Sequence, residues 1–194
     1  MKILRDKAIM LRVRNPKQIT TMIPNSKELP MNKVLVKWGL DEVLSLRSLN
    51  ITAPSPITKR YQWTGQHKPF EHQKDTASFL TLNKKSFCFN EQGTGKTASS
   101  IWAADYLIKI GKVKRVLVIC PLSIMDSAWR NDLFSFAMHR TVDVAHGDKA
   151  KRKKIINSGA EFVIINYDGV EVVQDEIAAG GFDLFIVDEA THYK

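Results

Sequence analysis

The sequence lacks the long apolar stretch that a membrane-spanning helix needs. Such a span takes roughly 18 consecutive apolar residues, whereas the longest apolar segment here, around Val116 to Leu122, has the length of a strand. The first residues carry charges among their apolar side chains, so they do not form the continuous apolar core of a secretory signal. We therefore predict no membrane association and an amino-terminal segment that is part of the folded protein.

Cysteine is scarce as well, since Cys88 and Cys120 are the only two in 194 residues. Both lie in apolar, strand-like runs, a setting that suits buried, reduced thiols better than a disulfide framework or a zinc site. Such usage is typical of an intracellular protein, and we expect a cytoplasmic one, with a nuclear protein as the alternative. The chain also has no internal repeat and no low-complexity tract. Its 44% hydrophobic residues suffice for a core.

Acidic residues are few in the first third of the chain. Residues 1–65 contain 12 Lys and Arg against 4 Asp and Glu, whereas residues 66–194 contain 17 against 16. The first segment therefore carries +8 of the formal net charge of +9. A basic segment joined to a nearly neutral body favours a polyanionic partner, with nucleic acid as the leading candidate. The alternative is a solvated basic surface.

The pattern divides the chain into a small mixed α/β unit over residues 1–65 and a larger unit over residues 66–194. In the first unit the expected elements are strands at 8–13 and 34–38 and a helix at 40–49. Two prolines, Pro54 and Pro56, then stand one residue apart. Because they fix the backbone and remove hydrogen-bond donors, we place a linker there.

The larger unit alternates strand-like runs with amphipathic, helix-length segments. The expected strands are 87–89, 116–120, 142–145, 162–165 and 184–187. The expected helices are 70–82, 96–110, 124–138, 149–157 and 170–178. This alternation predicts an α/β fold with a mostly parallel sheet and helices on both faces. Ligands of such sheets bind at the carboxyl ends of the strands.

A glycine-rich loop follows the first of these strands and leads directly into a helix. Its residues are Asn90, Glu91, Gln92, Gly93, Thr94, Gly95, Lys96 and Thr97. The glycines let the backbone curl so that N–H groups point at phosphate oxygens, and the helix adds the positive end of its dipole. Lys96 would contact the β- and γ-phosphates, and Thr97 would ligate Mg²⁺. The alternative is a glycine-rich turn with an incidental lysine, and Asn90 stands where the eight-residue pattern usually has glycine.

The last strand-like run ends in two carboxylates, Asp188 and Glu189. At the top of the sheet beside a phosphate loop, Asp188 would hold Mg²⁺ and Glu189 would polarise the attacking water. Taken alone, an exposed acidic pair at a strand end is the competing interpretation. Its place about ninety residues after the loop favours the nucleotide site.

Together these motifs resemble the first motor lobe of superfamily 2 helicases, and within them the Swi/Snf-type DNA translocases. The resemblance covers about residue 68 to the end. The motifs that carry it are Phe70-Glu71-His72-Gln73, Asn90 to Thr97, Val118 to Ser123 with Trp129, Ala145 to Asp148 with Arg152, Val163 to Tyr167, and Asp188-Glu189-Ala190-Thr191. It implies a RecA-like lobe with ATP and Mg²⁺ as cofactors.

The resemblance also implies roles for matching residues. Gln73 would read the adenine edge with Phe70 nearby, while Lys96, Asp188 and Glu189 would act in hydrolysis. Contacts to the sugar-phosphate backbone of one DNA strand would come from Pro121, Leu122, Ser123, Asn166 and Tyr167. Such contacts position the protein without reading sequence. Gln73 could instead be an exposed helix residue, and Trp129 could serve core packing.

Two features depart from the family's pattern. Thr191 replaces the usual histidine of the Asp-Glu-Ala-His box, and His192 is displaced by one place. The sequence also ends soon after this box, before the family's second lobe and its arginine finger, a group worth about 10³ to 10⁵ in rate. We expect that this lobe is required in cis or in trans and that the chain alone binds ATP but hydrolyses it poorly.

The leading hypothesis is the ATP-binding front portion of a double-stranded-DNA translocase or helicase, with residues 1–65 as an accessory DNA-contacting unit. The rival is a non-catalytic module that binds nucleic acid or a partner and keeps the P-loop fold as a scaffold. A metabolic P-loop kinase is disfavoured, because the segments at Pro121–Ser123 and Asn166–Tyr167 have no evident task in one.

Overall fold

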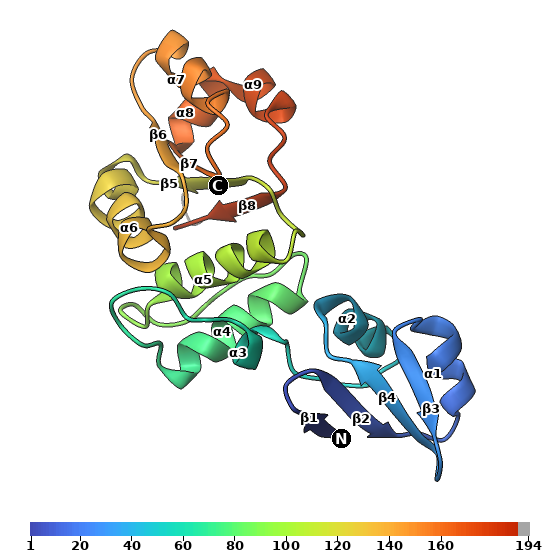
Figure 1. Cartoon of the computed structure of the whole chain (residues 1–194). Coiled ribbons are helices and arrows are strands. Elements are labelled where there is room, and N and C mark those ends of the chain that lie inside the picture. The colour runs from blue at the N-terminus through green and yellow to red at the C-terminus, as the bar shows by residue number, and fades with distance from the viewer. Residues whose placement is uncertain (190–194) are drawn as a thin grey trace. The chain divides into compact units, whose positions relative to one another are not determined.

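The computed structural model describes residues 1–189 and shows two compact units (Figure 1). The first comprises Met1–Gln62 and Ala77–Phe87, and the second comprises Trp63–Thr76 and the residues from Cys88 onward. We predicted a single cut after residue 65. The contacts instead group residues 77–87, which include the end of a helix, with the amino-terminal unit. Among the described residues no helix is both long and apolar enough to cross a membrane.

The first unit is a four-stranded antiparallel sheet with short helices. Its strands, in spatial order, are β1 (Lys2–Leu4), β2 (Ala8–Arg12), β4 (Lys33–Lys37) and β3 (Ser26–Leu29). Its helices are α1 (Pro16–Met22), α2 (Leu40–Ser48) and α3 (Ile57–Arg60). The predicted strands and helix appear as β2, β4 and α2. β1 and β3 were missed because they are short, and β3 contains only one apolar residue.

One face of this sheet forms the core of the first unit. Side chains alternate along a strand, so Ile9 and Leu11 of β2 lie on the same face as Val34 and Val36 of β4, and all four are buried. Helices α1 and α2 cover this face with apolar residues that include Ile19, Val43 and Leu46, and Ile23, directly after α1, packs with them. The opposite face carries none of this cluster.

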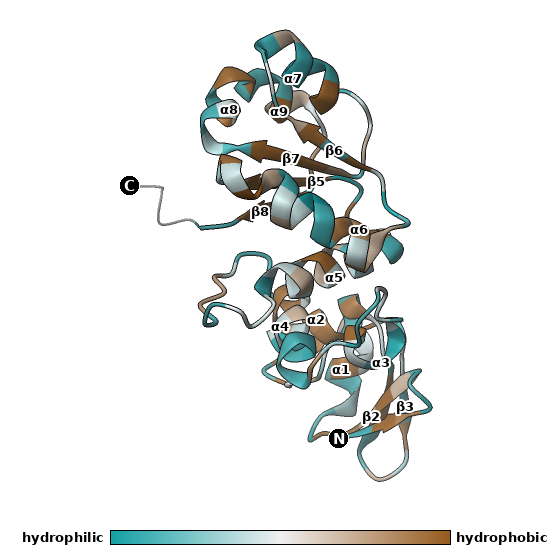
Figure 2. Cartoon of the chain, turned by 90° about the vertical axis from the view of Figure 1, so that its left-hand side faces the viewer, coloured by the Kyte–Doolittle hydropathy of each residue, from teal (hydrophilic) through white to brown (hydrophobic). Residues whose placement is uncertain are grey.

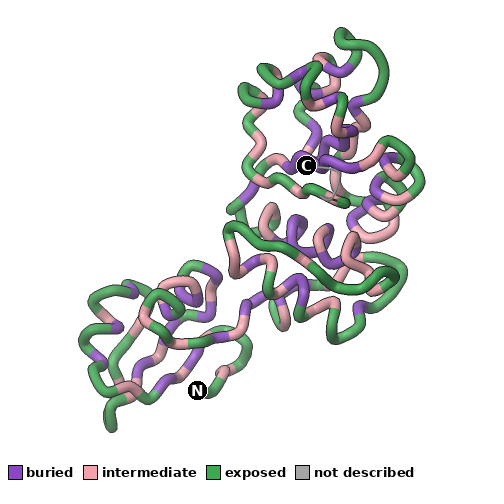
Figure 3. The backbone as a smooth tube through the Cα atoms, turned by 180° about the vertical axis from the view of Figure 1, so that it is seen from behind, coloured by how far each residue is buried: buried purple, intermediate pink, exposed green. Residues whose placement is uncertain are grey.

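The second unit contains a parallel sheet in the order β6-β7-β5-β8, which confirms the predicted RecA-like α/β class. The strands are β5 (Val116–Cys120), β6 (Val142–Ala145), β7 (Phe162–Asn166) and β8 (Leu184–Val187). Every residue of β5 and β7 is buried. Figure 2 shows both strands in the brown of hydrophobic residues, and Figure 3 marks buried residues in purple. Continuous apolar strands are expected where helices cover both faces.

The helices of this unit lie on both sides of the sheet. They are α4 (Glu71–Leu82), whose last residues belong to the first unit, α5 (Lys96–Lys109), α6 (Asn131–Ala137), α7 (Lys149–Ile156), α8 (Tyr167–Val172) and α9 (Gln174–Ala179). Helices α5 and α6 pack on one face, and α7 and α9 pack on the other. Figure 1 shows α5 antiparallel to β5, so the loop before α5 lies toward the carboxyl ends of the strands.

Two helices that we predicted as continuous are broken. The segment 124–138 consists of a 3₁₀ turn, η1 (Leu122–Ile124), a π-helical turn, η2 (Met125–Arg130), and then α6. The segment 170–178 is interrupted at Val173, whose φ of −130° and ψ of 33° are not helical. Apolar periodicity alone does not reveal such breaks, since both sides of each break keep a buried face.

The predicted strand at 87–89 is not formed, and this expectation was wrong. The segment belongs to neither sheet, and Phe87 and Phe89 are 75% and 89% exposed. The described parallel sheet ends at β8, where Phe185 and Val187 are also exposed. The apolar character of three residues alone therefore does not place a segment in a sheet.

Candidate functional site

The glycine-rich loop curls as the sequence predicts. Gly93 and Gly95 have φ values of 76° and 77°, in the left-handed region that favours glycine. Gly95 also stands directly before the first turn of α5. A Cβ atom at Gly95 would lie 2.1 Å from Gln73 Nε2, whereas a Cβ at Gly93 would meet nothing within 4 Å. Position 95 therefore requires glycine for its conformation and for the close approach of Gln73.

Lys96 points back into this loop. Its ammonium donates hydrogen bonds of 2.9 Å to the backbone carbonyl oxygens of Asn90 and Glu91. The Thr94 hydroxyl donates to the same Glu91 carbonyl oxygen at 2.8 Å. The loop therefore forms a closed curve around the ammonium at the amino end of a 14-residue helix. A curled loop at the amino end of a helix is a place where anions commonly bind.

The first turns of α4 hold this loop from the side. The Gln73 amide oxygen accepts from the Phe70 N–H at 2.9 Å, and its Nε2 donates to the Thr94 carbonyl oxygen at 3.3 Å. His72 Nε2 lies 3.1 Å from the same carbonyl oxygen. The Phe70 ring is exposed and stacks on His72, with ring centroids 5.7 Å apart. The structure thus brings Phe70 and Gln73 next to the loop, where we predicted the adenine-reading group.

Asn90, the departure from the P-loop pattern, has a visible structural role. Its side-chain amide donates to the Thr76 hydroxyl at 2.9 Å, and Thr76 in turn donates to the His72 carbonyl oxygen within α4. The asparagine therefore fastens the start of the loop to α4. Sequence reasoning missed this contact, since Thr76 is an ordinary helix residue by its pattern.

Asp188 lies at the carboxyl end of β8 and is held at four atoms. Its N–H donates to the Ile119 carbonyl oxygen at 2.9 Å. Its Oδ2 accepts from Trp129 Nε1 at 2.9 Å, and its Oδ1 accepts from the Glu189 N–H at 3.0 Å. Its carbonyl oxygen accepts from the Tyr167 hydroxyl. The Trp129 ring is buried in the core, so this residue both packs and donates.

Cys120 ends the neighbouring strand β5, and the nearby carboxylates affect the pKa of its thiol. Burial, together with the negative charges of Asp188 and Glu189, raises the pKa of the thiol to about 12. The thiol therefore stays neutral near pH 7 and is a poor nucleophile. Both cysteines are free, with Cys120 buried and Cys88 half-buried. Ala190, Thr191 and His192 of the predicted box lie outside the described residues.

The two segments expected to face nucleic acid also lie at this sheet edge. Leu122 and Ser123 are exposed on η1, directly after Pro121 and the end of β5. Asn166 ends β7 but is buried, and its amide oxygen accepts from Arg152 Nη1 at 2.9 Å. Tyr167 follows it and reaches Asp188. At this edge the η1 residues are therefore accessible, whereas the Asn166 side chain is buried and already hydrogen-bonded within the protein.

Arg152 supports the turn after β7 from within. Besides Asn166, its guanidinium donates to the carbonyl oxygens of Ala145 and Gly147 at 2.6 and 2.8 Å. A Cβ at Gly169 would lie 2.1 Å from its Nη1, so the first turn of α8 needs glycine there. This buried arginine is a structural brace that links β6, α7 and β7.

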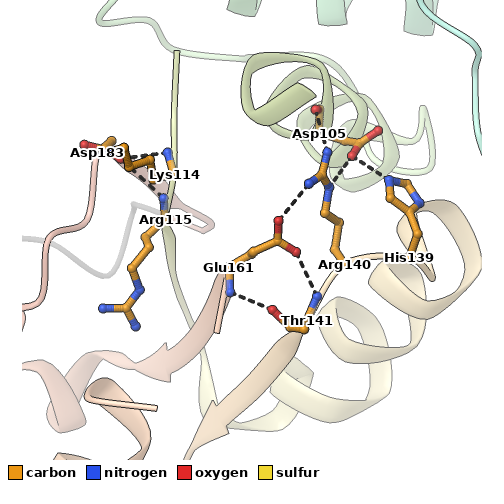
Figure 4. A network of polar contacts seen from close by, with 8 residues as sticks. All are labelled: Asp105, Lys114, Arg115, His139, Arg140, Thr141, Glu161 and Asp183. Carbon is orange, nitrogen blue, oxygen red and sulfur yellow. Dashed lines mark hydrogen bonds and ion pairs between the residues drawn. The ribbon is translucent and has the colours of Figure 1, made fainter. Parts of the chain in front are cut away.

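A polar network closes the opposite, amino-terminal edge of the sheet (Figure 4). Its members directly before the four strands are Lys114 and Arg115, Thr141, Glu161, and Asp183. Asp183 accepts from the backbone N–H groups of Lys114 and Arg115 at 2.7 and 3.3 Å. Thr141 and Glu161 exchange two hydrogen bonds of 3.0 and 3.1 Å. The network therefore links the starts of neighbouring strands.

The centre of this network is a buried ion pair. Arg140 Nε donates to Asp105 Oδ1 at 2.5 Å, and Arg140 Nη1 donates to Glu161 Oε1 at 2.7 Å. His139 Nε2 lies 2.9 Å from the same Asp105 oxygen. The Asp105 side chain is 1% exposed. These contacts connect α5 to the residues after α6 and to Glu161 before β7. The sequence pattern did not indicate them.

The residues at the carboxyl edge suit a nucleotide and Mg²⁺ chemically. A curled loop at a helix amino end supplies N–H donors and one ammonium, which match phosphate oxygens. Thr97 and Asp188 supply hydroxyl and carboxylate oxygens, the ligands that Mg²⁺ prefers together with phosphate.

Comparison with known proteins supports the same assignment. The family profile described as "Type III restriction enzyme, res subunit" matches residues 57–194. Protein p41 of Acyrthosiphon pisum secondary endosymbiont phage 1 is 27% identical over 132 residues, which make up 66% of this chain and 28% of p41. This chain thus spans little more than a quarter of that relative.

Two solved structures from Sulfolobus solfataricus are similar over the same region. The SWI2/SNF2 ATPase core in complex with dsDNA matches with a TM-score of 0.56 and 25% identity, over 67% of this chain and 28% of that chain. The SWI2/SNF2 ATPase core domain matches with a TM-score of 0.55 and 25% identity, over 66% of this chain and 26% of that one. These matches and the family profile confirm the predicted resemblance to a helicase-type first motor lobe.

Proposed function

The chain belongs to the family of the type III restriction enzyme res subunit, and on that basis we propose that it is the ATP-binding first lobe of a motor that acts on double-stranded DNA. The observation that carries the proposal is the closed loop around Lys96, fastened on one side to Gln73 of α4. Such an anion site could bind the phosphates of a nucleotide, and the neighbouring Gln73 amide could form hydrogen bonds with its base.

In the proposed site, Lys96 exchanges the carbonyl oxygens of Asn90 and Glu91 for the β- and γ-phosphates. The backbone N–H groups at the start of α5 bind the same phosphates, since they have no partner within the helix. Thr97 and Asp188 would hold Mg²⁺, which neutralises charge on the phosphates when bound. Glu189 would orient the water that attacks the γ-phosphate.

Gln73 is proposed to select adenine. Both ends of its amide already make hydrogen bonds, one within α4 and one to the loop at Thr94. An adenine edge offers a donor and an acceptor that can replace such bonds, and guanine offers the reverse arrangement. Binding of the base to Gln73 would therefore change the contact between Gln73 and the loop that binds the phosphates.

DNA contact is proposed at the exposed start of η1. Leu122 and Ser123 are accessible there, and Pro121 sets the direction in which the chain leaves β5. Because Arg152 occupies the Asn166 amide, contact at the second segment would come from its backbone and from the neighbourhood of Tyr167. The similar archaeal ATPase core in complex with dsDNA supports duplex DNA as the partner.

The amino-terminal unit is proposed as an accessory DNA-contacting element, and its sheet indicates which face. The strand register places five basic residues on the face opposite the core: Lys2, Arg12, Lys27, Lys33 and Lys37. The other strand residues of this face are apolar or alanine, and none is acidic. Such a face complements a phosphodiester backbone, which binds by charge without reading sequence.

This accessory role has a direct test in the salt dependence of duplex binding. The combined change of Arg12, Lys33 and Lys37 to Gln should reduce the slope of log affinity against log salt by about 1 per lost phosphate contact. A control with the same charge change replaces Lys7, Lys17 and Lys59, which are exposed outside this face. An equal effect in both variants would mean that only net charge matters and that this face makes no specific contacts.

The motor function is tested with the full-length product of the gene that encodes this chain. Duplex DNA should stimulate its ATP hydrolysis, and Lys96→Ala should abolish the stimulated rate, whereas Lys154→Ala at an exposed position should not. Hydrolysis that ignores all nucleic acids would exclude the motor. A protein that binds duplex DNA but no nucleotide would instead support the rival, a non-catalytic binding module.

A further inference from the structure

The two side chains that hold Asp188 come from the two segments that the proposed function turns toward DNA. Trp129 belongs to η2, which follows Pro121–Ser123 and η1 directly. Tyr167 follows Asn166 at the end of β7. One contacts the Asp188 carboxylate and the other its backbone carbonyl. A shift of either segment therefore acts on the residue proposed to hold the metal.

The local backbone around Trp129 is unusual. Residues Met125–Arg130 form a π-helical turn, which is rare and often marks functional sites. In this turn the Trp129 ring is 1% exposed and packs in the core with Met125 and Leu133. A rigid ring fixed in this way transmits movement of η2 to its N–H group, which is 2.9 Å from Asp188 Oδ2.

The second contact is braced in a similar manner. Asn166 and Tyr167 form the turn from β7 into α8, and Arg152 holds this turn through the Asn166 amide oxygen. The Tyr167 hydroxyl then reaches the Asp188 carbonyl oxygen. The two contacts hold different atoms of Asp188, so together they fix its backbone and its carboxylate.

We propose that Trp129 and Tyr167 are positioning residues that couple nucleic-acid contact at η1 and at the β7–α8 turn to metal binding by Asp188. The inference rests on the proposed function. It assigns Trp129 a role beyond core packing and Tyr167 a role beyond backbone contact. Because linkage is reciprocal, bound Mg²⁺–nucleotide must change duplex affinity by the same factor as duplex changes nucleotide affinity.

The first experiment measures metal holding without relying on hydrolysis. It compares the affinity of the chain for a non-hydrolysable ATP analogue with and without Mn²⁺, and the ratio isolates the metal's contribution. Trp129→Phe keeps an aromatic ring and removes the N–H donor. Loss of a group that orients a metal ligand typically weakens metal binding about 10-fold or more, so the ratio should fall by about that factor.

A matched control is available in the same unit. Trp102 is also 1% exposed, and its Nε1 donates to the Thr64 carbonyl oxygen at 2.8 Å, away from Asp188. Trp102→Phe removes the same atoms from the core and should leave the Mn²⁺ ratio unchanged. Tyr167→Phe, which loses only a hydroxyl, provides a second test if Trp129→Phe does not fold.

The second experiment measures duplex affinity with and without the Mn²⁺ analogue complex. In the wild type the complex should change duplex affinity by about 5-fold or more, within the usual range of coupled sites. In Trp129→Phe and Tyr167→Phe this factor should move toward 1, and in Trp102→Phe it should stay. Wild-type ratios and coupling in both variants would overturn the inference. A wild type that binds no analogue would contradict the proposed function itself.

Discussion

At the scale of single residues, Gly95 carries two constraints at once. Its φ of 77° lies in the left-handed region, and the Gln73 amide occupies the space that a side chain would need. Gly93 shares the first constraint, with a φ of 76°, but not the second. A comparison of substitutions at the two glycines can therefore distinguish the effect of backbone strain from the effect of the close contact with Gln73.

Alanine at these two positions should have different costs. Each change forces a side chain into a left-handed conformation, at about 1–2 kcal/mol of the free energy of unfolding. Gly95→Ala must in addition displace Gln73, so it should cost more and should reduce the preference for ATP over GTP. Chemical denaturation and nucleotide titrations measure both effects.

A double-mutant cycle provides the control for this prediction. In a Gln73→Ala background the space beside Gly95 is free, so the extra cost of Gly95→Ala should disappear while that of Gly93→Ala stays the same. Equal costs for both glycines in the wild-type background would contradict the close approach of Gln73.

The Asp105–Arg140 ion pair lies at the other, amino-terminal edge of the sheet, where we expect it to contribute to stability. Removing one partner of a buried pair leaves an uncompensated charge and typically costs about 3–5 kcal/mol. We therefore expect Arg140→Met to lower the free energy of unfolding by about that amount, because Asp105 is almost fully buried. Thermal and denaturant unfolding provide the measurement.

An exposed pair offers the control with the same substitution. Arg130 and Asp126 lie 3.3 Å apart with both side chains more than half exposed. Such pairs contribute about 1 kcal/mol or less, so Arg130→Met should change stability little. If Arg140→Met were equally mild, Asp105 would be solvated in solution and the network would not brace the strands.

At the scale of elements, the sheet separates stability from chemistry. Its amino edge is closed by side chains that bond backbone groups of neighbouring strands, such as Asp183 and Glu161. Its carboxyl edge brings together Cys120, Tyr167 and Asp188. This division is general for parallel sheets, whose ligands bind where the strands end.

The elements also show why part of the fold could be predicted and part could not. Strands β5 and β7 are continuous runs of buried residues, and such runs reveal a central parallel strand in the sequence itself. The run Phe87–Phe89 has similar local character but forms no ladder, because strand formation depends on a neighbour that local sequence does not specify. The π-helical turn at Met125–Arg130 left no trace in the apolar spacing, because the segments on both sides of it keep a buried face.

The candidate site divides in the same way. The loop 90–97 and the pair Asp188–Glu189 could be predicted, since contiguous residues carry their chemistry. The contact from Trp129 to Asp188 joins positions 59 residues apart, and that from Asn90 to Thr76 joins a loop to the interior of a helix. Only the fold brings such pairs together.

At the scale of the whole molecule, charge and chemistry fall on different units. Residues 1–65 hold nearly all the excess positive charge, and the register of their sheet gathers five basic side chains on one face. The second unit carries the phosphate loop and the acidic edge. This distribution agrees with the proposal that the first unit binds a polyanion and the second unit binds a nucleotide.

The proposed motor function depends most on nucleotide binding by the loop around Lys96. The decisive measurement is a calorimetric titration of the 194-residue chain with ATP and Mg²⁺, in the wild type and in Lys96→Ala, with Lys154→Ala as control. We predict measurable binding in the wild type and in the control and a loss of at least about 10-fold in Lys96→Ala, because a charge-assisted contact to phosphate is removed. Equal affinity in all three proteins would contradict the account.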